Sequence, residues 1–161
     1  MIMEQNEILF RLMAASLLGV LIGLERELRG TAAGIRTIAL VCVGSALYTI
    51  LALIVSEPGQ NPAIITSSII TGIGFLGAGA ILRTMSDVRG LTTAATIWLA
   101  AGIGMAAGYG LFYEAIVATI IAVIFLAIVR VIEVRFFDKD GKETKKTIRN
   151  SKLVKSWQFL R

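Results

Sequence analysis

Long apolar stretches alternate with short charged segments along most of this 161-residue chain. The 20 positions between Arg36 and Glu57 hold no charge, and neither do the 25 positions before Arg83 or the 24 after Arg89. About 20 apolar residues are enough for a helix to cross the roughly 30 Å hydrocarbon core of a bilayer. Because these stretches lack the polar face typical of soluble helices, the pattern predicts an integral membrane protein.

The connections between the apolar stretches differ in charge. Basic residues occur in residues 25–36 and 83–90, whereas residues 56–62 and the connection near Gly110 have none. Ten of the sixteen basic residues follow position 129. Since basic segments remain in the cytoplasm, the N-terminus is predicted outside and the C-terminus inside. We predict an all-α polytopic protein with five transmembrane helices, at residues 8–24, 36–55, 63–82, 91–109 and 111–132.

Composition agrees with this prediction. The chain is 56% hydrophobic and 17% charged, with a mean hydropathy of +0.79. A transmembrane domain over residues 1–132 and a short basic cytoplasmic tail over residues 133–161 are expected. The tail is interpreted as an arm on anionic lipid or protein, and nucleic acid is not an expected partner. The chain has no histidine, which removes the usual metal ligand and proton carrier.

The charged residues at the two ends of the first predicted span are too close together for the helix between them to cross the whole bilayer core. Only 13 residues separate Arg11 from Glu25, about 20 Å of helix. Either Arg11 extends to the outer surface or Glu25 lies at membrane depth. We interpret Arg11, like Glu114 near the outer end of the fifth span, as reaching water.

Glycines recur at the spacing that lets helices approach closely. Gly19 and Gly23 are four residues apart, as are Gly104 and Gly108, but this spacing does not say whether the contacts lie within one chain or between chains. A third group in the span at 63–82 is interpreted either as a packing surface or as an unwound ion path. Its members are Gly72, Gly74, Gly77 and Gly79.

Charged and hydroxyl residues gather in two short segments on the predicted cytoplasmic side. If the first helix continues, Glu25 and Arg29 lie one turn apart and can pair. Unpaired charges at the membrane rim are costly, so we expect a paired network that is either architectural or a ligand site. The members of this charge cluster are Glu25, Arg26, Glu27, Arg29, Arg36, Arg83, Asp87, Arg89, Thr92 and Thr93.

Two ligands would suit such a site. Glu25, Glu27 and Asp87 offer hard oxygen atoms suited to Mg²⁺. The N-terminus of the fourth span, beside Thr92 and Thr93, offers free amides to an anion. No cofactor other than Mg²⁺ is suggested by these residue types.

Several motifs carry a family resemblance: Gly23-Leu-Glu-Arg-Glu27, Gly34-x-Arg36-Thr37, the glycine-rich run from Ser68 to Ile81, and Val88-Arg-Gly-Leu-Thr-Thr-Ala-Ala95. In this order and at this spacing, over about residues 8–130, the chain resembles the MgtC/SapB family. The resemblance implies a multi-pass protein of the bacterial inner (plasma) membrane that is tied to magnesium limitation. It further implies a regulator, linked in some members to virulence and survival inside macrophages, with the ATP synthase as a proposed target.

The resemblance also leads to an expectation about domain content and to two competing functions. Many members carry a soluble C-terminal domain resembling an ACT fold, so with about 30 residues after the fifth span we expect a short member without it. The leading hypothesis is a regulator of magnesium and envelope stress that contacts other membrane proteins and forms a homo-oligomer. The alternative is a small ion transporter or channel, with Mg²⁺ as one candidate ion. Enzymatic activity is not expected, because no serine or threonine has a recognisable activating base.

Overall fold

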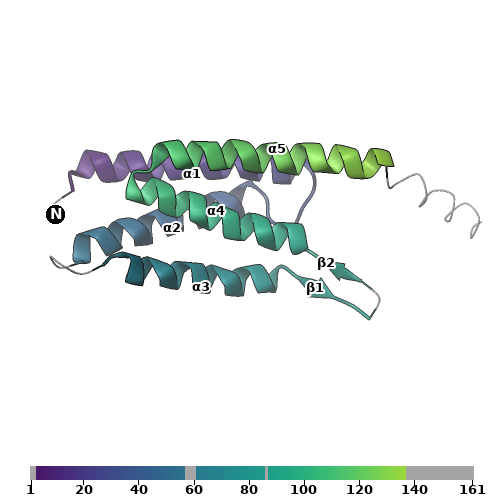
Figure 1. The fold of residues 1–161 in the computed structure, drawn as a ribbon, viewed down its shortest axis with the longest axis horizontal. Helices are drawn as coiled ribbons and strands as arrows, with labels where there is room; N and C mark the ends of the chain where they lie inside the picture. Colours follow the sequence, from purple (N-terminus) through teal and green to yellow (C-terminus); the bar gives the residue numbers. More distant parts are fainter. Residues whose placement is uncertain (1–2, 57–60, 86, 137–161) are drawn as a thin grey trace, which may run out of the picture. The chain divides into compact units, whose positions relative to one another are not determined.

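The computed structural model describes residues 3–56, 61–85 and 87–136, with side chains through residue 128. The helices in this part of the chain are α1 (Gln5–Leu28), α2 (Ile35–Val55), α3 (Ala63–Gly79), α4 (Leu91–Tyr109) and α5 (Phe112–Phe136) (Figure 1). Residues up to Val123 form one compact unit, and the rest of α5 belongs to a second. The predicted basic tail lies outside the described residues from position 137 onward.

The helices follow the predicted spans, but α1 extends beyond the predicted 8–24 at both ends and α3 ends early. α4 coincides with the predicted 91–109, and α2 begins one residue early. The helix predicted at 63–82 ends at Gly79, because the next residues leave the helix to form a strand pair. β1 (Leu82–Arg83) and β2 (Val88–Arg89) are antiparallel, with Leu82 opposite Arg89. The all-α prediction therefore holds except for this two-stranded connection.

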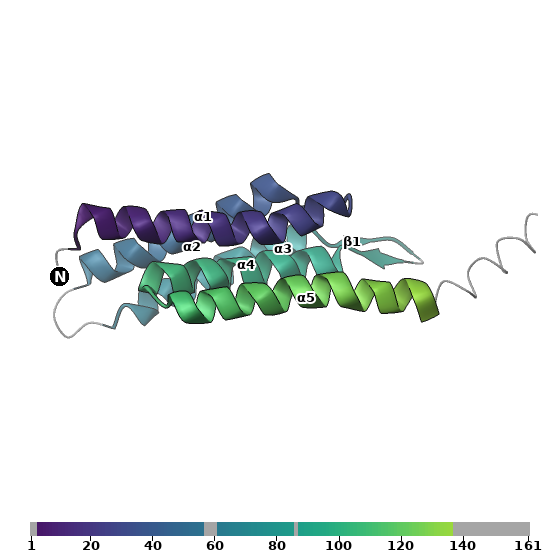
Figure 2. The ribbon, with the colours of Figure 1, turned by 90° about the horizontal axis from the view of Figure 1, so that it is seen from above.

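α2 is the central helix of the first compact unit. It packs against α1 and against α4, while α3 lies mainly against α4 (Figures 1 and 2). The centre of this packing is built from small side chains that are fully or almost fully buried: Ala15, Cys42, Ala46, Ala100 and Ala107. Small residues at helix contacts are typical of membrane proteins, in which close backbone packing replaces the hydrophobic effect between helices.

Gly19 and Gly23 bring α1 onto α2. A Cβ atom added to Gly19 would lie 2.8 Å from the Cα atom of Ala39, and one added to Gly23 would lie 2.6 Å from the Cα atom of Ile35. Neither position has room for a side chain. The close approach predicted from the glycine spacing is confirmed, and it occurs within one chain.

Gly104 and Gly108 bring α4 onto α2. A Cβ atom on Gly104 would overlap the carbonyl of Cys42 and lie 2.8 Å from its Cα atom. A Cβ atom on Gly108 would lie 2.7 Å from the carbonyl oxygen of Ala46. The two glycine pairs thus hold the three central helices together.

Three of the described helices are both long and apolar enough to cross a membrane: α1, α2 and α4. α3 is shorter, and the 25-residue α5 is described with side chains only through residue 128. The 17 residues of α3 give about 26 Å of helix, at the lower end of the range for a span. Large apolar side chains also face outward, such as Leu40 (71% exposed) and Phe75 (82% exposed). Such an apolar exterior fits a membrane rather than water.

Candidate functional site

The C-terminal end of α1 carries a compact ion-pair network. Because the helix continues to Leu28, Glu25 lies one turn before Arg29. The Nε atom of Arg26 donates to Oε2 of Glu25 at 2.6 Å, and Nε of Arg29 donates to Oε1 at 3.1 Å. Arg26 is only 4% exposed. The predicted Glu25–Arg29 pair is therefore confirmed, and Glu25 also neutralises a buried arginine.

Glu27 connects α1 to the start of α2. Its Oε2 atom accepts a hydrogen bond from the backbone N–H of Ile35 at 3.2 Å. The residue that caps α2, Gly34, offers no side-chain hydrogen bond, and a Cβ atom there would overlap the Glu27 carboxylate. A carboxylate at a helix N-terminus is stabilised by the unpaired amides and the helix dipole. Glu27 thus takes the place of an N-cap side chain.

The β1–β2 connection holds a second, exposed ion pair. Nε of Arg89 donates to Oδ2 of Asp87 at 2.7 Å, with the two side chains 80% and 49% exposed. This hydrogen bond lowers the pKa of the Asp87 carboxyl and raises that of Arg89. The backbone N–H of Thr84 donates to the carbonyl of Asp87 at 2.9 Å and closes the turn.

The two charged segments are not joined directly in the described residues. Each ion pair of the charge cluster there connects residues of a single segment, either at the end of α1 or in the β1–β2 connection. Arg36 and Arg83 are exposed, and neither takes part in an ion pair within the described residues. The structure therefore shows two local charge groups where the sequence suggested one network.

The carboxylates suggested for Mg²⁺ already have partners. Glu25 binds two arginines, Glu27 binds a backbone amide, and Asp87 binds Arg89. No three acidic, cysteine or histidine side chains of the described residues lie close enough together to hold a metal ion. Mg²⁺ requires near-octahedral oxygen ligands, and the described part of a single chain does not gather them.

Gly90 and two threonines shape the start of α4. Gly90 has φ of +89°, and a Cβ atom there would overlap the carbonyl of Ala80. Thr93 is buried, whereas Thr92 is exposed and its carbonyl accepts a hydrogen bond from Oγ1 of Thr96 at 2.7 Å. The motif around Gly90 therefore has a structural role, because only glycine combines this backbone angle with this contact.

Replacing Gly90 with alanine should destabilise the protein by more than the same change at Gly30. Both glycines have positive φ, but a Cβ atom on Gly30 would meet no atom within 4 Å. A strained backbone angle costs about 1–3 kcal/mol, and Gly90→Ala adds a steric overlap to that strain. Thermal unfolding of both variants in detergent measures the difference. Equal melting temperatures would contradict the contact between Gly90 and Ala80.

The glycines of α3 differ in their surroundings. Gly77 is buried, and a Cβ atom there would lie 3.6 Å from the carbonyl oxygen of Ala94, an ordinary contact distance. Cβ atoms on Gly72, Gly74 and Gly79 would meet no described atom within 4 Å. α3 is a continuous helix through all four glycines. Of the four, Gly77 alone lies against another helix within the described part of one chain.

Arg11 has a role that the sequence interpretation missed. It is only 9% exposed, so the expectation that it reaches water was wrong. Its Nη1 atom donates to the carbonyl of Gly108 at 2.6 Å, and its guanidinium also pairs with Glu7. Carbonyls at a helix C-terminus lack helical partners and carry partial negative charge. Arg11 therefore joins α1 to the end of α4, where Gly110 leaves room for it.

Together, the apolar exterior, the small-residue packing and the ion-paired helix end define a helical membrane protein. The MgtC family model matches residues 12–135. The chain therefore belongs to the MgtC family.

Relatives from several bacteria share this region. The chain is 50% identical over 123 residues to Protein MgtC of Salmonella typhimurium, covering 74% of this chain and 52% of the relative. It is 44% identical over 119 residues to Protein MgtC of Brucella abortus, covering 74% and 50%. An uncharacterised Synechocystis protein is 42% identical over 122 residues, covering 76% and 52%. The chain spans about half the length of these relatives, and no solved structure matches it significantly.

Proposed function

We propose that this protein acts in the bacterial inner membrane under magnesium limitation, as a regulator that binds another membrane protein. Membership of the MgtC family supports the proposal. The main structural support for the proposal is that the acidic side chains of the charge cluster already have partners. Glu25, Glu27 and Asp87 are engaged by partners of the same chain, as expected of groups that shape a helix end and present a surface.

The proposal includes five spans with the N-terminus outside and the C-terminus in the cytoplasm. The alternation of basic and non-basic connections supports it. Reporter fusions after Gly59, Met85 and Lys142 should report outside, inside and inside. A cytoplasmic signal at Gly59 would reverse the proposed orientation.

The exposed Arg89 is a better probe of a contact surface than the buried Glu25–Arg26 pair. Because its side chain is 80% exposed, Arg89→Ala should leave the membrane level and thermal stability of the protein unchanged. We expect this variant to impair growth under magnesium limitation in a complementation assay, and Arg89→Lys, which keeps the charge, to impair it less. Full growth of Arg89→Ala at normal protein level would argue against a functional surface in the β1–β2 connection.

One purification can identify the membrane protein partner and measure the size of the oligomer. Intact protein extracted in gentle detergent from magnesium-limited cells should retain a membrane protein partner, for which the ATP synthase is the first candidate to test. The mass of the purified species without that partner would give the size of the expected homo-oligomer. Recovery of the chain alone from such cells, after crosslinking in the membrane, would oppose the regulatory proposal.

A Mg²⁺ transporter is the alternative, and reconstitution separates the two. A charged side chain at the bilayer centre already costs at least about 2.5–3.5 kcal/mol, so a divalent ion needs a full shell of oxygen ligands. Purified protein in liposomes containing a magnesium-sensitive dye should therefore admit no more Mg²⁺ than empty vesicles. Saturable entry above that of empty vesicles would favour the transporter.

A further inference from the structure

A pocket of about 710 Å³ lies between α2 and α3. Its walls are mainly apolar side chains that are themselves exposed at the protein surface, including Leu40 of α2 and Leu76 of α3. The pocket therefore opens toward the surroundings of the helices, which in a membrane protein are lipid. It is separate from the ion pairs at the end of α1.

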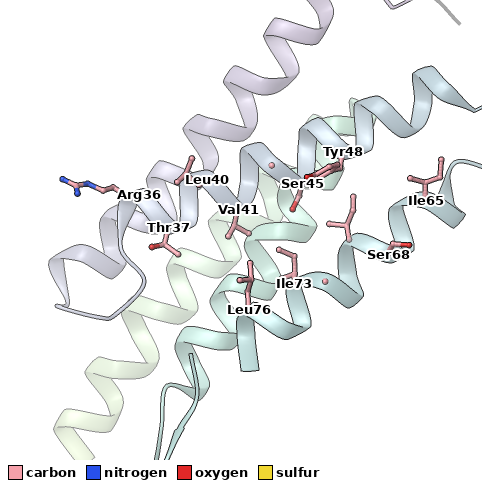
Figure 3. A pocket seen from close by; sticks show the side chains of 13 residues that line it. Arg36, Thr37, Leu40, Val41, Ser45, Tyr48, Ile65, Ser68, Ile73 and Leu76 are labelled. Atoms are coloured by element: carbon pink, nitrogen blue, oxygen red, sulfur yellow. The ribbon is translucent and has the colours of Figure 1, made fainter. Parts of the chain in front are cut away.

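The pocket carries a charge at one end. Arg36 and Thr37 lie at the end nearest the start of α2, and the lining continues along that helix to Tyr48 (Figure 3). Arg36 is the one charged side chain among the described residues that line it. Figure 3 shows its guanidinium extending away from α3, beyond this end of the pocket. An arginine whose stem follows an apolar surface while its head reaches outward is suited to the headgroup layer of a membrane.

The length of the pocket corresponds to one leaflet. Arg36 and Tyr48 are 12 positions apart on α2, which is about 18 Å along a helix. Half of the hydrocarbon core of a bilayer is about 15 Å. An acyl chain is apolar and extended, so it matches both the lining and the length of this pocket.

Two glycines keep the pocket open. Gly44 and Gly72 line it from opposite helices, and Cβ atoms on either would meet no atom within 4 Å. The packing of the described chain therefore does not require glycine at these positions. Beside them, the buried Oγ atom of Ser45 has no hydrogen-bond partner in the described residues.

We propose that this pocket binds one anionic phospholipid. One of its two acyl chains lies between α2 and α3 over Gly44 and Gly72, and the phosphate lies at Arg36 and Thr37. The charge of Arg36 selects an anionic headgroup over a zwitterionic one. This site requires only that the protein lies in a membrane, so it does not depend on a role in magnesium limitation.

Native mass spectrometry of the full chain in detergent tests the proposal with two lipids, phosphatidylglycerol and phosphatidylcholine. We expect one phosphatidylglycerol per chain, bound about fivefold more tightly than phosphatidylcholine, which is the contribution of roughly one basic residue near an anionic surface. Arg36→Gln should remove this preference, whereas the exposed Arg83→Gln should retain it. Equal binding of the two lipids by the wild-type protein would overturn the charge selection.

Gly72→Leu tests the pocket itself. A leucine here would occupy the pocket, so binding of phosphatidylglycerol should be lost. Gly74→Leu is the matched control, because Gly74 is also in α3 with open space around it but does not line the pocket. Melting temperatures in lipid-free detergent at or above that of the wild type would show that both variants are folded.

Two results would overturn the pocket assignment. The first is folded Gly72→Leu that binds phosphatidylglycerol as well as Gly74→Leu does. The second is disulfide crosslinking of Gly72→Cys to a second copy of the chain in native membranes, because a neighbouring helix would then occupy the space assigned to the lipid.

Discussion

Glu25→Ala is expected to lower the free energy of unfolding by about 3–5 kcal/mol, the usual cost of removing one partner from a buried ion pair. Glu25 is the acceptor for both Arg26 and Arg29. Arg26 is almost completely buried, so the alanine variant leaves its charge without compensation and away from water. Thermal or denaturant unfolding in detergent measures the loss.

The pair in the β1–β2 connection provides the control. Asp87→Asn breaks an ion pair of the same chemistry, but both of its side chains are exposed, so little change in stability is expected. Glu25→Met combined with Arg26→Met removes both buried charges and should recover most of the stability lost in Glu25→Ala. Equal effects of Glu25→Ala and Asp87→Asn would contradict the burial of the Arg26 pair.

The methionine double variant also separates architecture from function. If it is stable and supports growth under magnesium limitation, the Glu25–Arg26 pair serves only the fold. If it is stable and inactive, this end of α1 takes part in the regulatory contact. Glu25→Ala alone does not distinguish these cases, because its loss of stability also lowers the amount of protein.

Gly104→Leu is expected to disrupt the contact between α4 and α2. Even the first carbon of the new side chain would overlap the backbone of Cys42, which belongs to a helix and cannot move independently. Overpacking of this kind typically costs about 1–3 kcal/mol and sometimes more. A large fall in melting temperature, with loss of a single well-folded species on size-exclusion chromatography, is the expected result.

Gly102→Leu is the matched control for this change. Gly102 lies two residues before Gly104 in α4, and a Cβ atom there would meet no atom within 4 Å. Leucine is a better helix former than glycine by somewhat less than about 1 kcal/mol, so Gly102→Leu should be neutral or slightly stabilising. The reverse order of stability would show that α4 presents a different face to α2.

The positions of the helices could be predicted from the amino-acid sequence alone. A helix in a membrane satisfies its backbone hydrogen bonds within its own segment, so hydropathy and the positions of charges are sufficient to locate it. This is why α4 coincides with its predicted range. The Glu25–Arg29 pair was also predictable, because residues four apart on a helix are neighbours regardless of what surrounds them.

The contacts between residues far apart in the sequence became visible only in the three-dimensional structure. Arg11 and Gly108 are 97 positions apart, and nothing near either residue in the sequence indicates their hydrogen bond. The strand pair after α3 was missed because it involves only two residues on each side, too few to produce a pattern.

The glycines show most directly the difference between what the sequence predicts and what depends on the fold. Spacing alone identified Gly104 and Gly108 as sites of close approach, but the same residue type in α3 leaves Gly72 and Gly74 beside open space. A transmembrane helix is apolar on all sides, so its sequence does not distinguish a face that touches another helix from one that touches lipid. That choice depends on how the other helices are placed around it, which is a property of the assembled fold.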